Sequence, residues 1–207
     1  MENREVNCIV LIDVDGTLIP SLIDFESLRE QIRRLLGVND TLRPLGARLA
    51  ALPIPNELKD IAWSIIERAE IESVEHIDIK DLEENIKSVR HIKEIGFKVV
   101  IITARSRLSL KLILEKLGIN KYVDMCVTRD LNPERKAQLR YIKTLFEREK
   151  ARIIFIGDSV YDEEASRELG IEFIKVNNYR ELPGSIEKAI SVCINTLDHR
   201  TGFDSSV

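Results

Sequence analysis

The sequence predicts an α/β protein with a parallel sheet and a helical insertion after the first strand. Short apolar runs recur at 9–12, 99–102, 153–156 and 173–176, and the first three are almost entirely aliphatic and β-branched. Such runs are typical of parallel strands buried on both faces. Amphipathic segments separate the later runs, so that helix and strand alternate over residues 80–182, as in a wound α/β sheet.

Glycines mark the expected ends of three helical segments in this region. The phrases KEIGFKV, EKLGI and RELGI each place a glycine directly after a helical stretch and before an apolar residue. Glycine favours helix ends because it adopts the left-handed conformation without steric cost. The run at 122–127 supplies one more strand, and a final helix is expected over about 185–197.

The segment between the first and second strands follows a different pattern. Apolar side chains recur at helical spacing over 25–36 and over 58–69, where Asn56 is the expected N-cap. Prolines interrupt the segment, and Trp63 is expected in its hydrophobic core in preference to serving as a platform for substrate. We predict a helical cap inserted into an α/β core, with the core formed by residues 1–20 and 81–207 and the cap by residues 21–80.

Composition argues against several classes of function. The chain has 207 residues, 44% of them hydrophobic, and a net charge of −4, which gives no electrostatic reason to bind nucleic acid. We expect no membrane span, because no apolar run is long enough to cross a bilayer. The scattered cysteines are expected to be reduced thiols of a cytoplasmic protein; they are Cys8, Cys126 and Cys193.

Polar side chains collect where three of the predicted strands end. The first run continues into Asp13 and Asp15, the second ends at Thr103, and the run at 153–156 leads into Asp158. Ligands of parallel sheets bind beyond the carboxyl ends of the strands. These side chains are therefore expected to meet at one edge of the sheet.

Each of these polar residues also has a purely structural explanation. Asp15 and Gly16 between apolar runs form a common hairpin turn signal. Asp158 and Ser159 could cap the following helix, and Asp162 would suit the positive end of its dipole. These explanations treat each residue alone and do not explain why the polar groups gather at corresponding strand ends.

A phosphoryl-transfer site would explain the gathering. Asp13 and Asp158 provide hard oxygen ligands suited to Mg²⁺. A carboxylate can attack phosphorus to form an aspartyl-phosphate, and a second carboxyl such as Asp15 can protonate the leaving oxygen and later activate water. A hydroxyl from Thr103 and a lysine, for which Lys136 is the candidate, could hold the phosphoryl oxygens.

The phosphate-binding cation is expected at the start of a helix before the run at 153–156. The stretch NPERK offers Asn132 as N-cap, Pro133 as the first helical residue and Lys136 in the first turn. A helix N-terminus also favours an anion. Arg129 and Lys143 remain alternatives to Lys136.

Four motifs in this order resemble those of the haloacid dehalogenase superfamily. They are DVDGT at 13–17, VVIIT ending at Thr103, Lys136, and GDSVYD at 157–162. The resemblance covers roughly residues 5–20 and 80–180. It implies a Rossmann-like sheet, Mg²⁺ as cofactor, and a helical cap like that of phosphoglycolate-phosphatase-like members.

The resemblance also implies a role for each motif residue. Asp13 would be the nucleophile and Asp15 the acid/base, with the carbonyl of Asp15 on the metal. Thr103 and Lys136 would bind phosphate, and Asp158 would bind Mg²⁺.

Three further residues are expected to support the site. Asp162 is a second carboxylate near the metal, and Ser159 follows the metal-binding aspartate. Arg105 lies near the rim, where it either touches substrate or is an exposed arginine at a helix start.

The leading hypothesis is a Mg²⁺-dependent phosphatase that hydrolyses a small phosphorylated metabolite through an aspartyl-phosphate. Two alternatives are a phosphomutase of the same superfamily and a non-catalytic phosphate-binding module. A phosphatase for nucleic acid ends is disfavoured, because the chain is acidic and lacks a basic, aromatic-rich stripe.

Overall fold

The structure, a computed structural model, describes residues 8–198 and contains one parallel sheet. Five strands lie in the order β3-β2-β1-β4-β5, and every neighbouring pair is parallel. The strands are β1 (Cys8–Ile12), β2 (Lys98–Ile102), β3 (Met125–Val127), β4 (Arg152–Gly157) and β5 (Glu172–Lys175). The predicted α/β fold with a parallel sheet is therefore confirmed.

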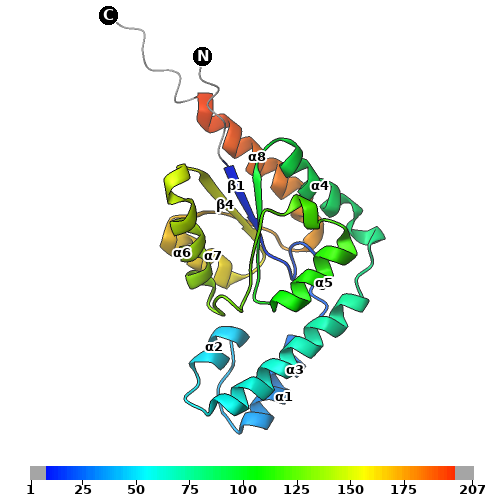
Figure 1. Cartoon of the computed structure of the whole chain (residues 1–207), viewed down its shortest axis with the longest axis vertical. Coiled ribbons are helices and arrows are strands. Elements are labelled where there is room, and N and C mark those ends of the chain that lie inside the picture. The colour runs from blue at the N-terminus through cyan, green and yellow to red at the C-terminus, as the bar shows by residue number, and fades with distance from the viewer. Residues whose placement is uncertain (1–7, 199–207) are drawn as a thin grey trace, which may run out of the picture.

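Helices cover both faces of the sheet (Figure 1). One face packs against α4 (Glu83–Glu94), α5 (Arg107–Leu117) and α8 (Leu182–Asp198). The other face packs against α6 (Arg135–Phe146) and α7 (Val160–Leu169). Successive β1 residues alternate between these two hydrophobic clusters, as the two-residue period of a strand requires. No helix in the described part of the chain is long and apolar enough to cross a membrane.

The sequence predicted the C-terminal ends of two helices correctly and the start of a third incorrectly. α5 and α7 end at Gly118 and Gly170, which adopt the expected left-handed conformation with φ of 62° and 64°. The predicted N-cap of α6 is wrong: the helix begins at Arg135, two residues later than expected. Asn132 instead accepts a hydrogen bond from the Glu134 N–H, so its side chain closes a turn before the helix starts.

The segment between β1 and β2 forms the cap helices α1 (Phe25–Leu36), α2 (Leu45–Ala51) and α3 (Asn56–Glu75). These helices lie beyond the carboxyl ends of the strands (Figure 1). They enclose a hydrophobic cluster of their own, which includes Leu28, Ile32, Leu49 and Ile66. The short helix α2 was not predicted, because two turns are too few to establish a helical period.

Helix α3 belongs to both the cap and the core. Its residues Ala62 and Ile66 pack in the cap cluster, whereas Val74 packs in the core cluster with α4 and α5. The helix begins at Asn56, but Pro55 occupies the N-cap position and no side chain caps it. The proposed division of the chain at residues 21–80 remains a prediction, and residues 1–7 and 199–207 of the predicted core lie outside the described residues.

The cysteines differ from expectation. Cys8 at the start of β1 and Cys193 on α8 are buried and form a disulfide, so the prediction of three reduced thiols is wrong for this pair. The two residues are 185 positions apart, and they meet only because α8 packs back against the sheet. Cys126 is a free, exposed thiol.

Candidate active site

A tight turn follows β1 and sets the position of the first motif. The Val14 carbonyl accepts hydrogen bonds from the N–H groups of Leu18 (2.9 Å) and Ile19 (3.0 Å). Gly16 has φ of +80°, and a Cβ at this position would lie 2.3 Å from Oδ2 of Asp158. Only glycine fits here, because the backbone is left-handed and the carboxylate is in contact. The hairpin explanation of Asp-Gly is wrong, since both neighbours of β1 are parallel.

Three carboxylates form an acidic cluster at the carboxyl edge of the sheet, consisting of Asp13, Asp158 and Asp162. One oxygen from each lies within 4.8 Å of the others. Asp13 and Asp162 are buried, and Oδ2 of Asp162 has no hydrogen-bond partner. Arg135 contacts two members: its Nη2 lies 2.6 Å from Asp13 Oδ1 and its Nε 2.5 Å from Asp162 Oδ1. The cluster thus holds three carboxylates and one contacting guanidinium.

Burial, together with the neighbouring carboxylates, raises the pKa of Asp13 and of Asp158. Burial raises the pKa of Asp13 well above its ordinary value; Arg135 opposes the shift, and the neighbouring Asp162 and Asp158 add to it. Burial, followed by the charge of Asp162, raises the pKa of Asp158 to about 6. A divalent cation would favour the ionised carboxylates.

Arg135, and not Lys136, lies against the acidic cluster. The Lys136 ammonium forms an ion pair with Glu168 on α7. Consecutive helical residues point about 100° apart, so the two side chains cannot both face the cluster. The two alternatives are also engaged elsewhere: Arg129 pairs with a buried glutamate of α3, and Lys143 donates to a carbonyl at the end of α7.

Thr103 is buried at the end of β2, beside the first motif. Its Oγ1 accepts a hydrogen bond of 3.1 Å from the Arg105 N–H, which leaves the hydroxyl proton free to donate. Its carbonyl accepts from the Gln138 side chain at 2.9 Å, which fixes the strand end against α6. Ser159 has the structural role considered above: it is the N-cap of α7 and accepts from the Asp162 N–H at 3.1 Å.

Asp15 lies outside the acidic cluster and pairs with Arg105. Its two carboxylate oxygens accept from Nε and Nη2 of Arg105, each at 2.7 Å. Arg105 is 1% exposed, so the expectation of an exposed arginine at a helix start is wrong. The helix α5 begins at Arg107, and Ser106 is its N-cap.

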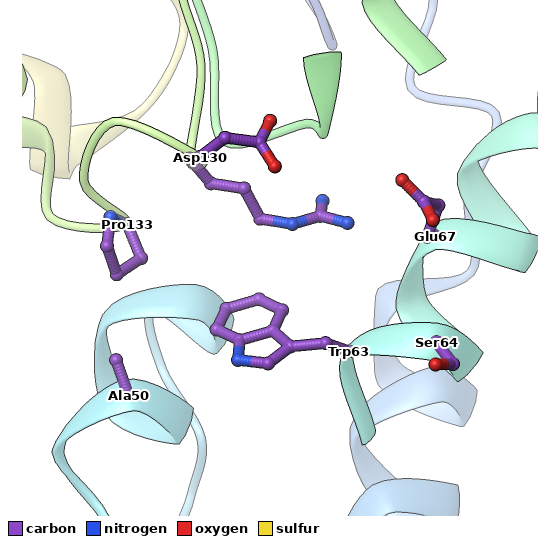
Figure 2. A pocket seen from close by; sticks show the side chains of 7 residues that line it. Ala50, Trp63, Ser64, Glu67, Asp130 and Pro133 are labelled. Carbon is purple, nitrogen blue, oxygen red and sulfur yellow. The ribbon is translucent and has the colours of Figure 1, made fainter. Parts of the chain in front are cut away.

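A cleft separates the cap helices from the core beside this site. A cavity of about 450 Å³ is lined by Trp63, Ser64 and Glu67 of α3 and by Asp130 and Pro133 of the core. In Figure 2 the Trp63 ring and the Glu67 side chain extend from α3 toward these core residues. The Arg129 guanidinium lies 5.2 Å from the Trp63 ring centre. Trp63 therefore packs against the cap cluster, as predicted, and also lines the cleft.

A second cavity adjoins the first along α2 and α6. It has a volume of about 630 Å³ and shares Ala50 and Pro133 with the first. Arg135 lines it, as does Tyr161 on α7. The cleft thus extends from Trp63 to Arg135, whose guanidinium contacts the acidic cluster, and Lys136 and Glu168 also line this second cavity.

Residues 10–176 match the family described as haloacid dehalogenase-like hydrolase. The chain belongs to this family. The match runs from within β1 to just past β5, so most of the parallel sheet, the cap helices and the four motif positions lie within it. The protein is therefore a hydrolase of the haloacid dehalogenase-like family.

Relatives of this family are similar over most of their length. The phosphoglycolate phosphatase of Nitrosococcus oceani is 23% identical, over 80% of this chain and 81% of the relative. A haloacid dehalogenase-like hydrolase structure from Streptococcus pneumoniae has a TM-score of 0.57 at 16% identity, covering 92% of this chain and 99% of the other. A subfamily IA, variant 1 hydrolase from Geobacter sulfurreducens has a TM-score of 0.53 at 17% identity, covering 89% and 99%. The structural likenesses show the shared fold.

Sequence reasoning missed two residues of this region. Arg135 was overlooked although it directly precedes Lys136 in the same first turn. Glu70 on α3 is 3% exposed and pairs with Arg129. Its position gave a signal, since it falls four residues after Ile66 and four before Val74, on the buried side of the helix.

Proposed function

We propose that this protein is a Mg²⁺-dependent phosphatase that hydrolyses a small phosphomonoester through an aspartyl-phosphate on Asp13. The observation that carries the proposal is the buried acidic cluster, with a guanidinium on Asp13, at the carboxyl edge of the sheet. Membership of a hydrolase family and similarity to a protein named phosphoglycolate phosphatase support a phosphomonoester as the substrate.

The residues of the acidic cluster suit Mg²⁺. Asp13, Asp158 and the main-chain carbonyl of Asp15 would hold it, and all three are the hard oxygen donors that Mg²⁺ prefers. The unpartnered Oδ2 of buried Asp162 is a further sign that the cluster is incomplete without a cation. When bound, Mg²⁺ would neutralise charge on the phosphoryl oxygens and on the carboxylates around it.

In the first step, an oxygen of Asp13 attacks phosphorus. The new bond from Asp13 to phosphorus forms as the bond to the ester oxygen breaks, and the bonding electrons leave with that oxygen. Asp15 enters this step protonated and gives that proton to the leaving oxygen, so that the alcohol leaves neutral and Asp15 becomes the carboxylate that Arg105 binds through both oxygens. Arg135 and the hydroxyl of Thr103 donate hydrogen bonds to the phosphoryl oxygens during transfer.

In the second step, water hydrolyses the aspartyl-phosphate. Asp15, now ionised, takes a proton from water as the water oxygen attacks phosphorus. The bond from phosphorus to Asp13 breaks, which regenerates the Asp13 carboxylate and releases phosphate. The cleft between the cap helices and the core would hold the leaving group, with Trp63 and Arg129 on its walls.

A panel of phosphorylated metabolites, assayed with and without Mg²⁺, tests the proposal. We expect at least one small phosphomonoester to release phosphate, only when a divalent cation is present and not with the Asp13→Asn variant. Isomerisation of a sugar phosphate in place of phosphate release would identify a phosphomutase. Tight binding of phosphate analogues without turnover would identify a binding module.

A further inference from the structure

Arg105 is buried with every donor of its guanidinium engaged. A guanidinium carries five N–H groups. Nε and Nη2 each donate to Asp15 at 2.7 Å, and Nη2 also donates to Ser73 Oγ at 3.0 Å. Nη1 donates to the Glu70 carbonyl at 3.0 Å and to Ser109 Oγ at 2.9 Å. No donor is left for a substrate.

The acceptors around Arg105 come from three separate elements. Asp15 lies in the turn after β1, Ser109 lies on α5, and Glu70 and Ser73 lie on the cap helix α3. Glu70 and Ser73 are three residues apart and therefore share one face of α3. One side chain thus joins the cap helix to the turn that carries the acid/base residue.

The same face of α3 is also fixed to the core by an ion pair. The Glu70 carboxylate pairs with Arg129 and accepts a hydrogen bond of 3.0 Å from the Ser106 N–H. Together Asp15, Glu70, Arg105 and Arg129 form a buried ion-pair network with two carboxylates and two guanidiniums. The position of α3 is therefore linked to the loop after β2 through Arg105 and Ser106, and to the loop after β3 through Arg129.

We infer that Arg105 is a positioning residue, which holds the Asp15 carboxylate in the orientation for proton transfer and makes that orientation depend on the cap helix α3. A planar guanidinium that binds both oxygens of a carboxylate fixes the plane of that carboxylate. Three other acceptors hold the guanidinium, and two of them are on α3. A displacement of α3 would therefore move the guanidinium, and with it the carboxylate of Asp15. The inference rests on the proposed function, in which Asp15 transfers the proton.

A double-mutant cycle between Arg105→Lys and Asp15→Asn tests the inference. Lysine keeps the charge but cannot bind both oxygens in one plane. We expect Arg105→Lys to lower kcat for an alkyl phosphate about 10- to 100-fold, with KM nearly unchanged, because misplaced proton transfer forfeits part of general acid catalysis. The loss should be smaller in the first turnover of 4-nitrophenyl phosphate, whose leaving group needs little protonation.

The cycle separates positioning from a purely structural role. In the Asp15→Asn background, Arg105→Lys should change kcat by less than about twofold, because residues that act through one another are non-additive. Arg107→Lys is the matched control: this arginine is exposed on the first turn of α5 and should leave turnover unchanged. Equal losses for both substrates and in both backgrounds would overturn the inference.

If the Arg105→Lys variant does not fold, a milder variant, Ser73→Ala, tests the same inference. Ser73→Ala removes one acceptor on α3 and leaves both bonds to Asp15 in place. It should cause a smaller loss with the same dependence on leaving group, and the loss should vanish in the Asp15→Asn background. A loss that persists there contradicts the inference while hydrolysis itself stands. Absence of any Asp13-dependent hydrolysis would overturn the proposed function, and this inference with it.

Discussion

Two buried groups of charges lie on either side of the turn after β1, and their charge balance differs. The acidic cluster contains three carboxylates with one contacting guanidinium, and one of its buried oxygens has no partner. The buried ion-pair network contains two carboxylates and two guanidiniums, and every N–H of Arg105 is used. Asp13 belongs to the first group and Asp15 to the second, although only one residue separates them.

The difference indicates what each group does. Buried charge is costly unless it is paired, so an excess of carboxylates favours binding of a cation. A charge-balanced network whose central guanidinium, that of Arg105, is fully bonded needs no ligand there and holds its elements in place. The acidic cluster therefore has the character of a binding site, and the ion-pair network that of a support.

The largest expected effect is from Asp13→Asn. An amide cannot form the aspartyl-phosphate, so turnover and covalent labelling by a phosphorylated substrate should both be lost. The free energy of unfolding without metal should be unchanged or higher, because the substitution removes charge from an over-charged cluster. Phosphate release, acid-stable labelling and thermal unfolding measure these effects. Activity close to that of the wild type would remove Asp13 as the nucleophile.

The next largest effect should distinguish Arg135 from its neighbour. Arg135→Ala should lower turnover by about 10²–10³, the range observed when a single donor to developing charge is removed. Lys136→Ala should change turnover little, because its partner Glu168 lies on the surface of α7. Steady-state kinetics of the two variants provides the comparison. A severe loss only in Lys136→Ala would return the phosphate-binding role to the residue chosen from the sequence.

Stability should respond in opposite directions to loss of charge in the two groups. Glu70→Gln leaves Arg129 without its counter-charge and should lower the free energy of unfolding. Burial raises the pKa of Glu70, so removing its charge also relieves a desolvation cost, and the loss should stay below the ~3 kcal/mol of a fully favourable buried pair. Asp158→Asn relieves repulsion and should leave metal-free stability unchanged or raise it. Urea denaturation in a chelating buffer compares them. An equal decrease in the free energy of unfolding in both variants would contradict an unfavourable excess of negative charge in the acidic cluster.

The smallest expected effect is a pH dependence of metal-free stability. The pKa of Asp158 is raised to about 6, so between its ordinary value of 3.8 and about 6 the folded state holds a proton that the unfolded state has lost. Stability should therefore fall as pH rises through this window. Because the side chain is partly exposed, we expect a loss of only about 1 kcal/mol. Denaturation curves at pH 4 to 7 should show a weaker dependence in Asp158→Asn.

The residues at the strand ends were predictable from the sequence. Parallel strands end at the same edge, so Asp13, Thr103 and Asp158 could be brought together from apolar runs alone. The choice between Arg135 and Lys136 was not predictable in the same way. Which residue of a first turn faces the sheet depends on where the helix starts, and α6 starts two residues later than its capping signals suggested.

Contacts between segments that are distant in the sequence could not be predicted from its local patterns. The Cys8–Cys193 disulfide and the Asp15–Arg105 pair each depend on how separate elements pack, and neither has a local signature. Glu70 stands among buried positions of α3, but its partner Arg129 follows β3. The hydrophobic period indicates which face of a helix or strand is buried, and capping signals indicate where a helix ends. Neither indicates which charged side chain of another segment will pair with a residue on that face.

We propose that the acidic cluster, and not the ion-pair network, binds the cation. Calorimetric titration of the metal-free protein with Mg²⁺ at pH 7.5 tests it directly, with Asp158→Asn and Glu70→Gln as the two variants. We predict one binding event in the wild type, retained in Glu70→Gln and weakened at least about tenfold in Asp158→Asn, since a lost ligand removes both a donor and a charge. Equal affinity in the wild type and Asp158→Asn would contradict the account.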